Sequence, residues 1–250
     1  MNTLRNIDRS GIVGLQQKSY MGGGDNMKRL LVLGVFVCAM LVLVVGPAHA
    51  VPTIQLSDGA TTVTVADNGV GDSNPTVGEV TYVGAVGATW FINVSTGESK
   101  PLLGTAQSPH MDLNSINNSN AAGTLTILWS DTDFTGIGTG QLKVGGTLTS
   151  GVGSSVDFFA YYDPANALFA LTDLITAEGP FGPGAYSQVK TGAIAGPAPY
   201  SLTLESVITH TAAGNTSFNK ELQLQVPEPA TLLLLGSGVM MLGLLRSRKQ

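Results

Sequence analysis

The sequence predicts an all-β fold: an antiparallel β-sandwich with an N-terminal signal peptide and a C-terminal transmembrane helix. Apolar and polar residues alternate in short segments rich in Val, Thr, Ile and aromatic residues, and Gly, Pro, Asn or Asp separates these segments. Helical periodicity is nearly absent between the two ends of the chain. Many short strands without helices are typical of two antiparallel sheets packed face to face. A barrel or a jelly roll fits the same pattern.

The first predicted element is a β-hairpin in the segment TIQLSDGATTVTVADNG, residues 53–69. The alternation stops at Asp58-Gly59, resumes, and stops again at Asn68-Gly69. Both dipeptides supply the positive φ angles that tight hairpin turns need. Seven further segments share short length, β-branched or aromatic residues and flanking turn residues. They are 79–84, 88–95, 124–131, 140–150, 155–163, 200–211 and 220–226.

One segment, DPANALFALTDLITAEG, fits two structures. A helix could begin there with Asp163 as N-cap and Pro164 at the first helical position. A long strand over residues 167–177 fits equally well, and the neighbouring strands favour it. The segments 179–185 and 195–200, rich in Gly and Pro, are predicted to be loops.

The N-terminal part resembles an export signal. Lys28 and Arg29 precede an uninterrupted apolar run over residues 30–45, and Ala48 and Ala50 form a small-residue cleavage step. These three parts in this order predict a secretory signal peptide at residues 27–50, cut after Ala50. A retained anchor helix is the alternative. Residues 1–26 match no targeting pattern, and we expect translation to start at Met27.

The body of the chain, residues 51–226, is acidic and free of cysteine. It has four lysines, no arginine and fourteen acidic residues, a net charge of −10. Such a surface offers nothing to the phosphates of nucleic acid, so no nucleic-acid partner is expected. A body of about 175 residues can bury a core sufficient for one domain without disulfides.

Residues that could carry chemistry are few. His110 and His210 lack partners at metal-ligand spacing, so we expect surface or strand-edge histidines. Asp131 and Asp133 stand two apart and are weak candidates for a structural calcium site, the one cofactor considered. No serine lies in a Gly-x-Ser-x-Gly turn. We therefore predict no catalytic residues and no enzyme activity.

The aromatic residues of the predicted strands allow two interpretations. They could form a platform on which sugar rings stack, but such residues more often fill the core of a sandwich. Trp90 and Trp129 have apolar neighbours, which favours the core for both. The set comprises Trp90, Phe91, Trp129, Phe134, Phe158, Phe159, Tyr161 and Tyr162.

The C-terminus has three parts in a fixed order. Pro227, Glu228 and Pro229 come first, residues 230–245 are uncharged and apolar, and the basic tip contains Arg246, Arg248 and Lys249. A helix over 230–245 would be roughly 24 Å long, slightly shorter than a hydrocarbon core of about 30 Å. The basic tip predicts a cytoplasmic end, which places the body outside.

This ending resembles the PEP-CTERM sorting signal of exosortase substrates, and the resemblance covers residues 226–250. It implies that the tail holds the exported protein in the inner membrane of a Gram-negative bacterium until exosortase acts near Pro227, Glu228 and Pro229. Family members reach the cell surface or extracellular matrix of bacteria that make exopolysaccharide. The motif is also labelled an ice-binding protein C-terminal domain, but no regular Thr-x-Thr ladder indicates ice binding here.

Together these observations predict an exported, non-catalytic protein of the cell surface or extracellular matrix, associated with exopolysaccharide. Its expected partners are signal peptidase and the general secretion machinery, the inner membrane as a transient anchor, and exosortase. Two alternatives remain: a secreted hydrolase acting on glycans, and a binding module that stays anchored in the membrane.

Overall fold

The computed structural model describes residues 51–225. The predicted signal peptide, the start at Met27, the Pro-Glu-Pro step, the apolar span and the basic tip lie outside the described residues. Within 51–225 the chain forms twelve strands and no helix, so this part contains no helix that could span a membrane. The strands are β1 (Thr53–Ser57), β2 (Thr62–Ala66), β3 (Glu79–Val86), β4 (Trp90–Glu98), β5 (His110–Ser119), β6 (Gly123–Phe134), β7 (Gly138–Thr149), β8 (Ser155–Asp163), β9 (Asp173–Phe181), β10 (Gly184–Ile194), β11 (Tyr200–His210) and β12 (Gly214–Gln225).

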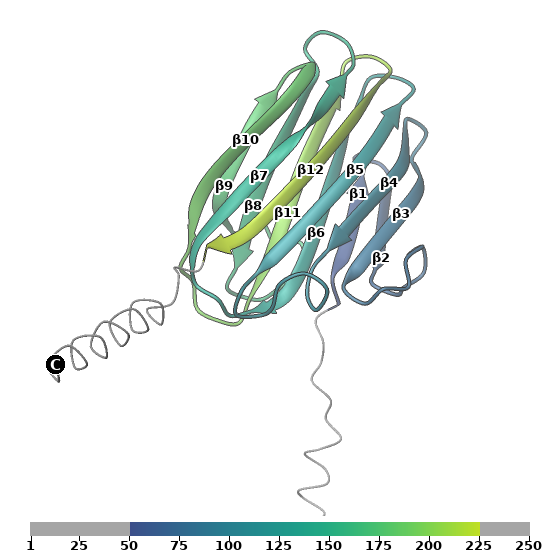
Figure 1. Cartoon of the computed structure of the whole chain (residues 1–250). Coiled ribbons are helices and arrows are strands. Elements are labelled where there is room, and N and C mark those ends of the chain that lie inside the picture. Colours follow the sequence, from purple (N-terminus) through teal and green to yellow (C-terminus); the bar gives the residue numbers. More distant parts are fainter. Residues whose placement is uncertain (1–50, 226–250) are drawn as a thin grey trace, which may run out of the picture. The chain divides into compact units, whose positions relative to one another are not determined.

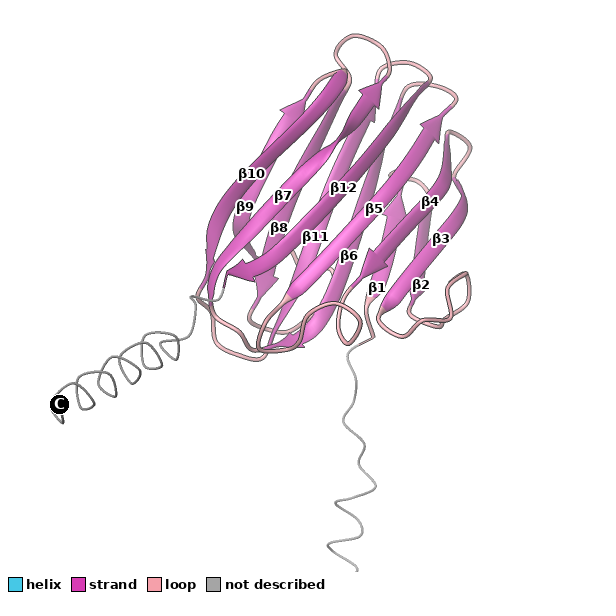
Figure 2. Ribbon diagram, viewed as in Figure 1, coloured by secondary structure: helices cyan, strands magenta, loops and turns pink. Residues whose placement is uncertain are grey.

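The strands form two six-stranded antiparallel sheets packed face to face (Figures 1 and 2). One sheet, here the β11 sheet, has the order β2-β1-β6-β11-β8-β9. The other, the β12 sheet, has the order β10-β7-β12-β5-β4-β3. The predicted all-β sandwich is confirmed, and the sheets are open, with β2, β9, β10 and β3 at their edges.

The core lies between the sheets and follows from the alternation of each strand. Every second residue points inward, and the buried apolar side chains form one cluster. Trp90 and Trp129 are both buried, as predicted. The rings of Phe158 and Phe218 meet edge to face with centroids 5.2 Å apart, which joins the two sheets near their middle. Residues 51–225 therefore contain a complete core of their own.

The predicted N-terminal hairpin is confirmed. β1 pairs with β2 in the register Ser57–Thr62, and the carboxylate of Asp58 accepts the N–H groups of Ala60 (3.0 Å) and Thr61 (2.6 Å). Gly59 has φ +90°, the conformation for which glycine is suited. The turn residues of the sequence thus act as their chemistry predicts.

The preferred strand over residues 167–177 is only partly correct, and the helical alternative is wrong. Residues 164–172 form an irregular loop, and β9 begins at Asp173. The Asp163 carboxylate accepts the N–H of Ala167 (3.0 Å) and the hydroxyl of Thr172 (2.8 Å). Asn166 and Phe169 have positive φ values, which interrupt both helix and strand.

Two strands were not predicted. β5 begins at His110 and lies outside all the segments predicted as strands, and β10 begins within the Gly- and Pro-rich segment 179–185 that was expected to be a loop throughout. β5 directs polar side chains inward, and β10 is exposed on both faces over most of its length. Neither strand has the apolar alternation that marks the other strands.

Candidate functional site

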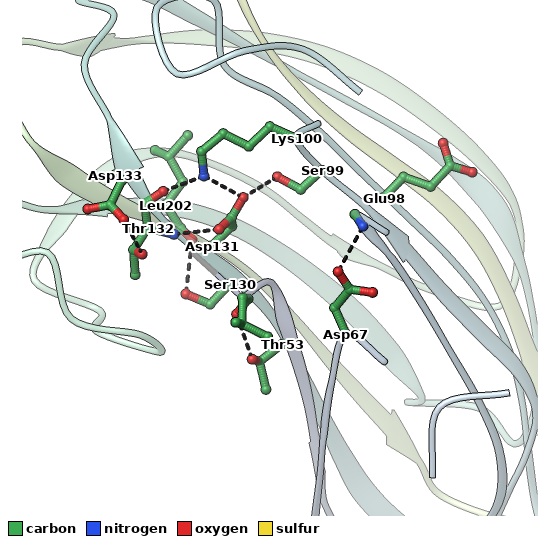
Figure 3. A network of polar contacts seen from close by, with 12 residues as sticks. Thr53, Asp67, Glu98, Ser99, Lys100, Ser130, Asp131, Thr132, Asp133 and Leu202 are labelled. Atoms are coloured by element: carbon green, nitrogen blue, oxygen red, sulfur yellow. Dashed lines mark hydrogen bonds and ion pairs between the residues drawn. The ribbon is translucent and has the colours of Figure 1, made fainter. Parts of the chain in front are cut away.

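Asp131, a calcium candidate, is fully buried near the end of β6 and forms an ion pair. Its Oδ2 accepts bonds from Lys100 Nζ (2.8 Å) and Ser99 Oγ (2.7 Å), and its Oδ1 accepts the N–H of Thr132 (2.8 Å) (Figure 3). Burial raises the pKa of Asp131, while the charge of Lys100 and these hydrogen bonds oppose the shift. The pair fastens the segment after β4 to the opposite sheet.

Asp133, the second calcium candidate, has different partners. It has φ +62° and lies in a β-bulge, where Thr132 and Asp133 oppose the single residue Ser201. Its N–H donates to Asn166 Oδ1 (2.9 Å), and Asn166 Nδ2 donates to Asp133 Oδ1 (2.7 Å). The bulge removes the regular alternation that would place Asp131 and Asp133 on one face.

No group of three or more His, Cys, Asp or Glu side chains within residues 51–225 is arranged to hold a metal ion. The calcium site therefore stays a prediction from the sequence alone.

His210 is buried, so the expectation of a surface or strand-edge histidine is wrong for this residue. Its Nδ1 lies 2.7 Å from Ser119 Oγ and its Nε2 lies 2.7 Å from Thr216 Oγ1. The ring packs on Trp90 with centroids 4.7 Å apart. Burial lowers the pKa of His210, which favours the neutral ring. These contacts make His210 part of a polar cluster inside the sandwich.

The outer face of the β12 sheet, turned away from the β11 sheet, carries a row of amides beside an exposed ring. Phe91 pairs with Asn118, and Asn118 pairs with Asn215, so the three lie side by side on β4, β5 and β12. Asn118 Nδ2 donates to Asn93 Oδ1 (2.9 Å), and Asn215 Nδ2 donates to Asn118 Oδ1. We call Asn93, Asn118 and Asn215 the amide ladder. Phe91 is 51% exposed.

Two hollows, each of about 310 Å³, lie beside the amide ladder. The first, the turn hollow, is bounded by Phe91, Asn118 and the turn between β3 and β4. The second, the glycine hollow, lies where β7 has Gly145 and Gly146 in place of side chains, and Ile116 forms part of its wall. An aromatic ring, amides and shallow depressions thus share one face.

A row of four carboxylates crosses the same face nearer the opposite end of the strands. Cross-strand pairing brings Glu79 next to Glu98, Glu98 next to Asp112, and Asp112 next to Glu221. Burial, and then the charges of Glu98 and Glu221, raise the pKa of Asp112 to about 6. Burial and the neighbouring acids Glu98 and Asp72 also raise the pKa of Glu79. We call these four residues the carboxylate row.

The side-chain nitrogens of His110 and Lys143 contact one end of the carboxylate row. His110 Nε2 lies 2.8 Å from Glu221 Oε1, and Lys143 Nζ lies 3.4 Å from Glu221 Oε2. His110 is therefore a half-buried strand residue with an acidic partner. Asp112, two residues further along β5, instead accepts a hydrogen bond from the side-chain amide of Asn114.

Of the aromatic residues considered in the sequence, Phe91 is the one exposed on this face, and its role in sugar stacking stays a prediction. Phe91 is exposed, whereas its neighbour Trp90 is buried, because adjacent residues of a strand point to opposite sides. The amide ladder was not predicted, because β5 was not recognised as a strand. Asn93, Asn118 and Asn215 are far apart in the sequence and become a row only once the strand register is known.

The described part is thus an acidic β-sandwich with a polar outer face. The C-terminal segment that follows it gives information on the destination of the protein. Residues 225–249 match the family model of the PEP-CTERM protein-sorting motif, which confirms the resemblance seen in the sequence. The motif identifies an exported protein that undergoes membrane-associated sorting to the cell surface, with exosortase as its processing partner.

Other comparisons add little. No curated protein matches the chain. A cryo-EM structure of broad bean stain virus matches with a TM-score of 0.31 and 18% identity, over 70% of this chain and 78% of that chain.

Proposed function

We propose that the protein is a non-catalytic component of the cell surface or extracellular matrix that binds exopolysaccharide through the outer face of the β12 sheet. The observation that carries this proposal is the exposed ring of Phe91 beside the amide ladder and the two hollows. The sorting motif supports delivery to a compartment where such polymers are present.

The residue types on this face suit a sugar. A pyranose ring presents a face of C–H groups, which packs on an aromatic ring, and a rim of hydroxyls, which need donors and acceptors. Each Asn side chain has two N–H donors and a carbonyl oxygen, more than the ladder itself uses. Held by its neighbours in the ladder, Asn118 needs little ordering when a ligand binds, which lowers the entropic cost of binding.

The charge of the face favours a neutral glycan. The carboxylate row lies on the same strands as the ladder, and the body carries a net charge of −10. An anionic polysaccharide would be repelled at low ionic strength. We therefore expect binding to uncharged glucans or galactans and weaker binding to alginate.

The route to the surface completes the proposal. The signal peptide directs the chain into the general secretion machinery, and signal peptidase cuts after Ala50. The apolar span then holds the body at the inner membrane of a Gram-negative bacterium until exosortase cuts near Pro227, Glu228 and Pro229. Two prolines disfavour helix in the residues that precede them, and this preference suits the extended peptide that a protease binds.

Replacing Phe91 by Ala tests the binding face. Purified 51–225 should be retarded in gels that contain dextran or galactan, and the Phe91→Ala variant should bind about tenfold more weakly, because aromatic contacts dominate such sites. Val70→Ala, which removes an almost fully exposed side chain in the β2–β3 loop, is the matched control and should bind like the wild type. Equal retardation of both variants would exclude Phe91 from the site.

The carboxylate row favours a second candidate function, a glycan hydrolase. Asp112, with its pKa raised to about 6 beside the carboxylates of Glu98 and Glu221, has the environment of a general acid. Release of reducing ends from the same glycans by 51–225, lost in Asp112→Asn, would establish this alternative. Binding without release would support the non-catalytic function.

A permanently anchored binding module is the remaining alternative. In that case the protein would keep Arg246, Arg248 and Lys249 and stay in the membrane fraction. Mass spectrometry of both termini in membrane and extracellular fractions distinguishes the two fates.

A further inference from the structure

Four strands form the edges of the two sheets, and three of them have features that hinder pairing with another chain. β2 has only five residues. β3 has an irregular register between Tyr82 and Gly84, and β9 has two such irregularities and contains Pro180. Short, bulged or proline-containing edges are the ordinary means by which sheet proteins avoid edge-to-edge association.

The fourth edge strand, β10, lacks all these features. It has eleven residues, and each pairs with β7 in an unbroken register from Gly184–Leu148 to Ile194–Gly138. β7 is its partner on one side, and the other side forms the edge of the sheet (Figure 1). Val189, at the middle of β10, is 55% exposed. The strand therefore has a long, unbroken edge of backbone donors and acceptors that no described strand pairs with.

The one charged residue of β10 does not block this edge. Lys190 points to the inner side of the strand, where its Nζ donates to the carbonyl of Ala177 in β9 (3.0 Å). The ammonium group is thus held by the neighbouring sheet. β9 covers part of the inner side of β10, where the carbonyl of Ile175 lies against Gly192, and no described strand pairs with the outer edge of β10.

We infer that β10 pairs antiparallel with β10 of a second copy of this chain, with the two-fold axis at Val189. Such a contact joins the two β12 sheets into one continuous twelve-stranded sheet. The two-fold register places Val189 opposite Val189, Gln188 opposite Lys190, and Ser187 opposite Thr191. No like charges meet in this register, because Lys190 is the one charged residue of β10 and lies opposite Gln188, so the strand can pair with its own copy.

The charge distribution favours a second copy at this edge over any other edge of the sheet. Neither β7 nor β10 contains an acidic residue, whereas the carboxylate row lies on β3, β4, β5 and β12. Pairing through β10 keeps the two carboxylate rows on the far sides of the joined sheet. Two bodies of charge −10 therefore approach through the edge of the β12 sheet whose two outermost strands carry no acidic residue.

The sorting segment of the same chain does not fit this edge. Pro227 and Pro229 stand two apart, so both would lack the N–H group on the same side of an added strand. β10 of a second copy contains no proline, so it has all of these N–H donors. This difference selects a second copy as the occupant.

A disulfide at the two-fold axis tests the register directly. Residues 51–225 contain no cysteine, because Cys38 lies in the N-terminal segment. Directly opposed residues of antiparallel strands have Cα atoms about 4.5–5.5 Å apart, within the range that a disulfide bridges. Val189→Cys in 51–225 should therefore form a disulfide-linked dimer under mild oxidation. Val83→Cys, equally exposed on the irregular edge strand β3, is the matched control and should stay largely monomeric.

Two further measurements complete the experiment. Ser187→Cys mixed with Thr191→Cys should cross-link faster than either variant alone, because only the mixture places cysteines opposite each other. Sedimentation of wild-type 51–225 over a dilution series should show a monomer–dimer equilibrium, which Val189→Lys weakens about tenfold or more by opposing like charges.

The inference is overturned if wild-type 51–225 sediments as a monomer throughout and Val189→Cys cross-links no faster than Val83→Cys. Cross-linking of Ser187→Cys with itself at the rate of the mixture would also overturn the two-fold register. Glycan binding by a monomer would leave the proposed function intact, so the two proposals fail separately.

Discussion

Lys220 lies on the inward face of β12 with its side chain fully buried. Its Nζ has no hydrogen-bond partner among the described residues and lies 5.6 Å from the ring centre of Phe158. Burial lowers the pKa of Lys220 well below its ordinary value, and the charge of Glu205 only partly opposes this shift. Burial therefore favours the neutral form of this amine in the folded core more than in the unfolded chain.

Replacing Lys220 by Met should stabilise the protein. A buried polar group without a hydrogen bond costs about 1–3 kcal/mol, and Met has a similar unbranched shape. Urea unfolding of 51–225 at pH 7 should therefore give a larger free energy of unfolding for Lys220→Met. The half-exposed Lys143, changed to Met, is the control and should have little effect.

The pH dependence of this difference has a definite sign. Since the pKa of Lys220 is lower in the folded state, the unfolded state binds more protons between the two pKa values, and stability rises with pH in that range. The advantage of Lys220→Met should consequently shrink as the pH rises from 7 towards 10. A constant difference over this range would mean that Lys220 stays charged in the core.

The sequence predicts the position of a residue in the fold well where its side chain has one chemical preference. The core positions of Trp90 and Trp129 follow from apolar neighbours, and the turn at Asp58-Gly59 follows from backbone geometry. His210 could not be placed, because its burial depends on Ser119 and Thr216, which only the folded chain brings to it. Lys220 is a similar case, since lysine usually lies at the surface.

Between elements, the spacing of the two sheets depends on Gly97 in β4. A Cβ atom at Gly97 would lie 2.5 Å from the ring of Trp129 in β6, far closer than real contacts. The indole N–H of Trp129 donates to the carbonyl of Glu98 (3.2 Å). The absent side chain at Gly97 thus lets the largest buried ring of one sheet pack directly on the backbone of the other.

Gly97→Ala should destabilise the sandwich by about 1–3 kcal/mol, because the ring of Trp129 must shift and its hydrogen bond must lengthen. Thermal unfolding measures the loss of stability, and tryptophan fluorescence measures the changed environment of Trp129. Gly145→Ala in β7 is the control, since a Cβ there meets only ordinary contacts at 3.7 Å or more. Equal melting temperatures for the two variants would show that Trp129 adapts without strain.

The sequence predicts the strands in which apolar and polar residues alternate, and it misses the strands that lack this alternation. β5 sends Ser115, Asn117 and Ser119 inward, where polar partners such as Ser95 and His210 receive them, so its pattern resembles a turn-rich loop. β10 has water on both faces, so neither face selects apolar residues. The amide ladder and the carboxylate row depend on the register of β5, and could not be predicted without it.

For the whole molecule, the test of sorting lies outside the sandwich. Glu228→Ala should cause the tailed form to accumulate in the membrane fraction, because the sorting motif loses the one charge between its two prolines. An epitope at the C-terminus and mass spectrometry of the extracellular fraction measure the two forms. Asp173→Ala, which removes an exposed acid from β9, should be processed like the wild type. Unchanged processing of Glu228→Ala would contradict the role of this residue in sorting.

The length of β12 sets the distance between the amide ladder and the C-terminal end of the sandwich. The strand begins beside the amide ladder at Asn215 and ends at Gln225, where the chain continues towards its sorting motif. The ten residue steps from Asn215 to Gln225 span about 33 Å of strand, so the amide ladder lies about that far from the end of β12. β12 therefore fixes the distance between the amide ladder and Gln225. A ligand bound at the amide ladder would therefore lie at the end of the sandwich opposite to Gln225, the strand end from which the chain continues to the sorting motif.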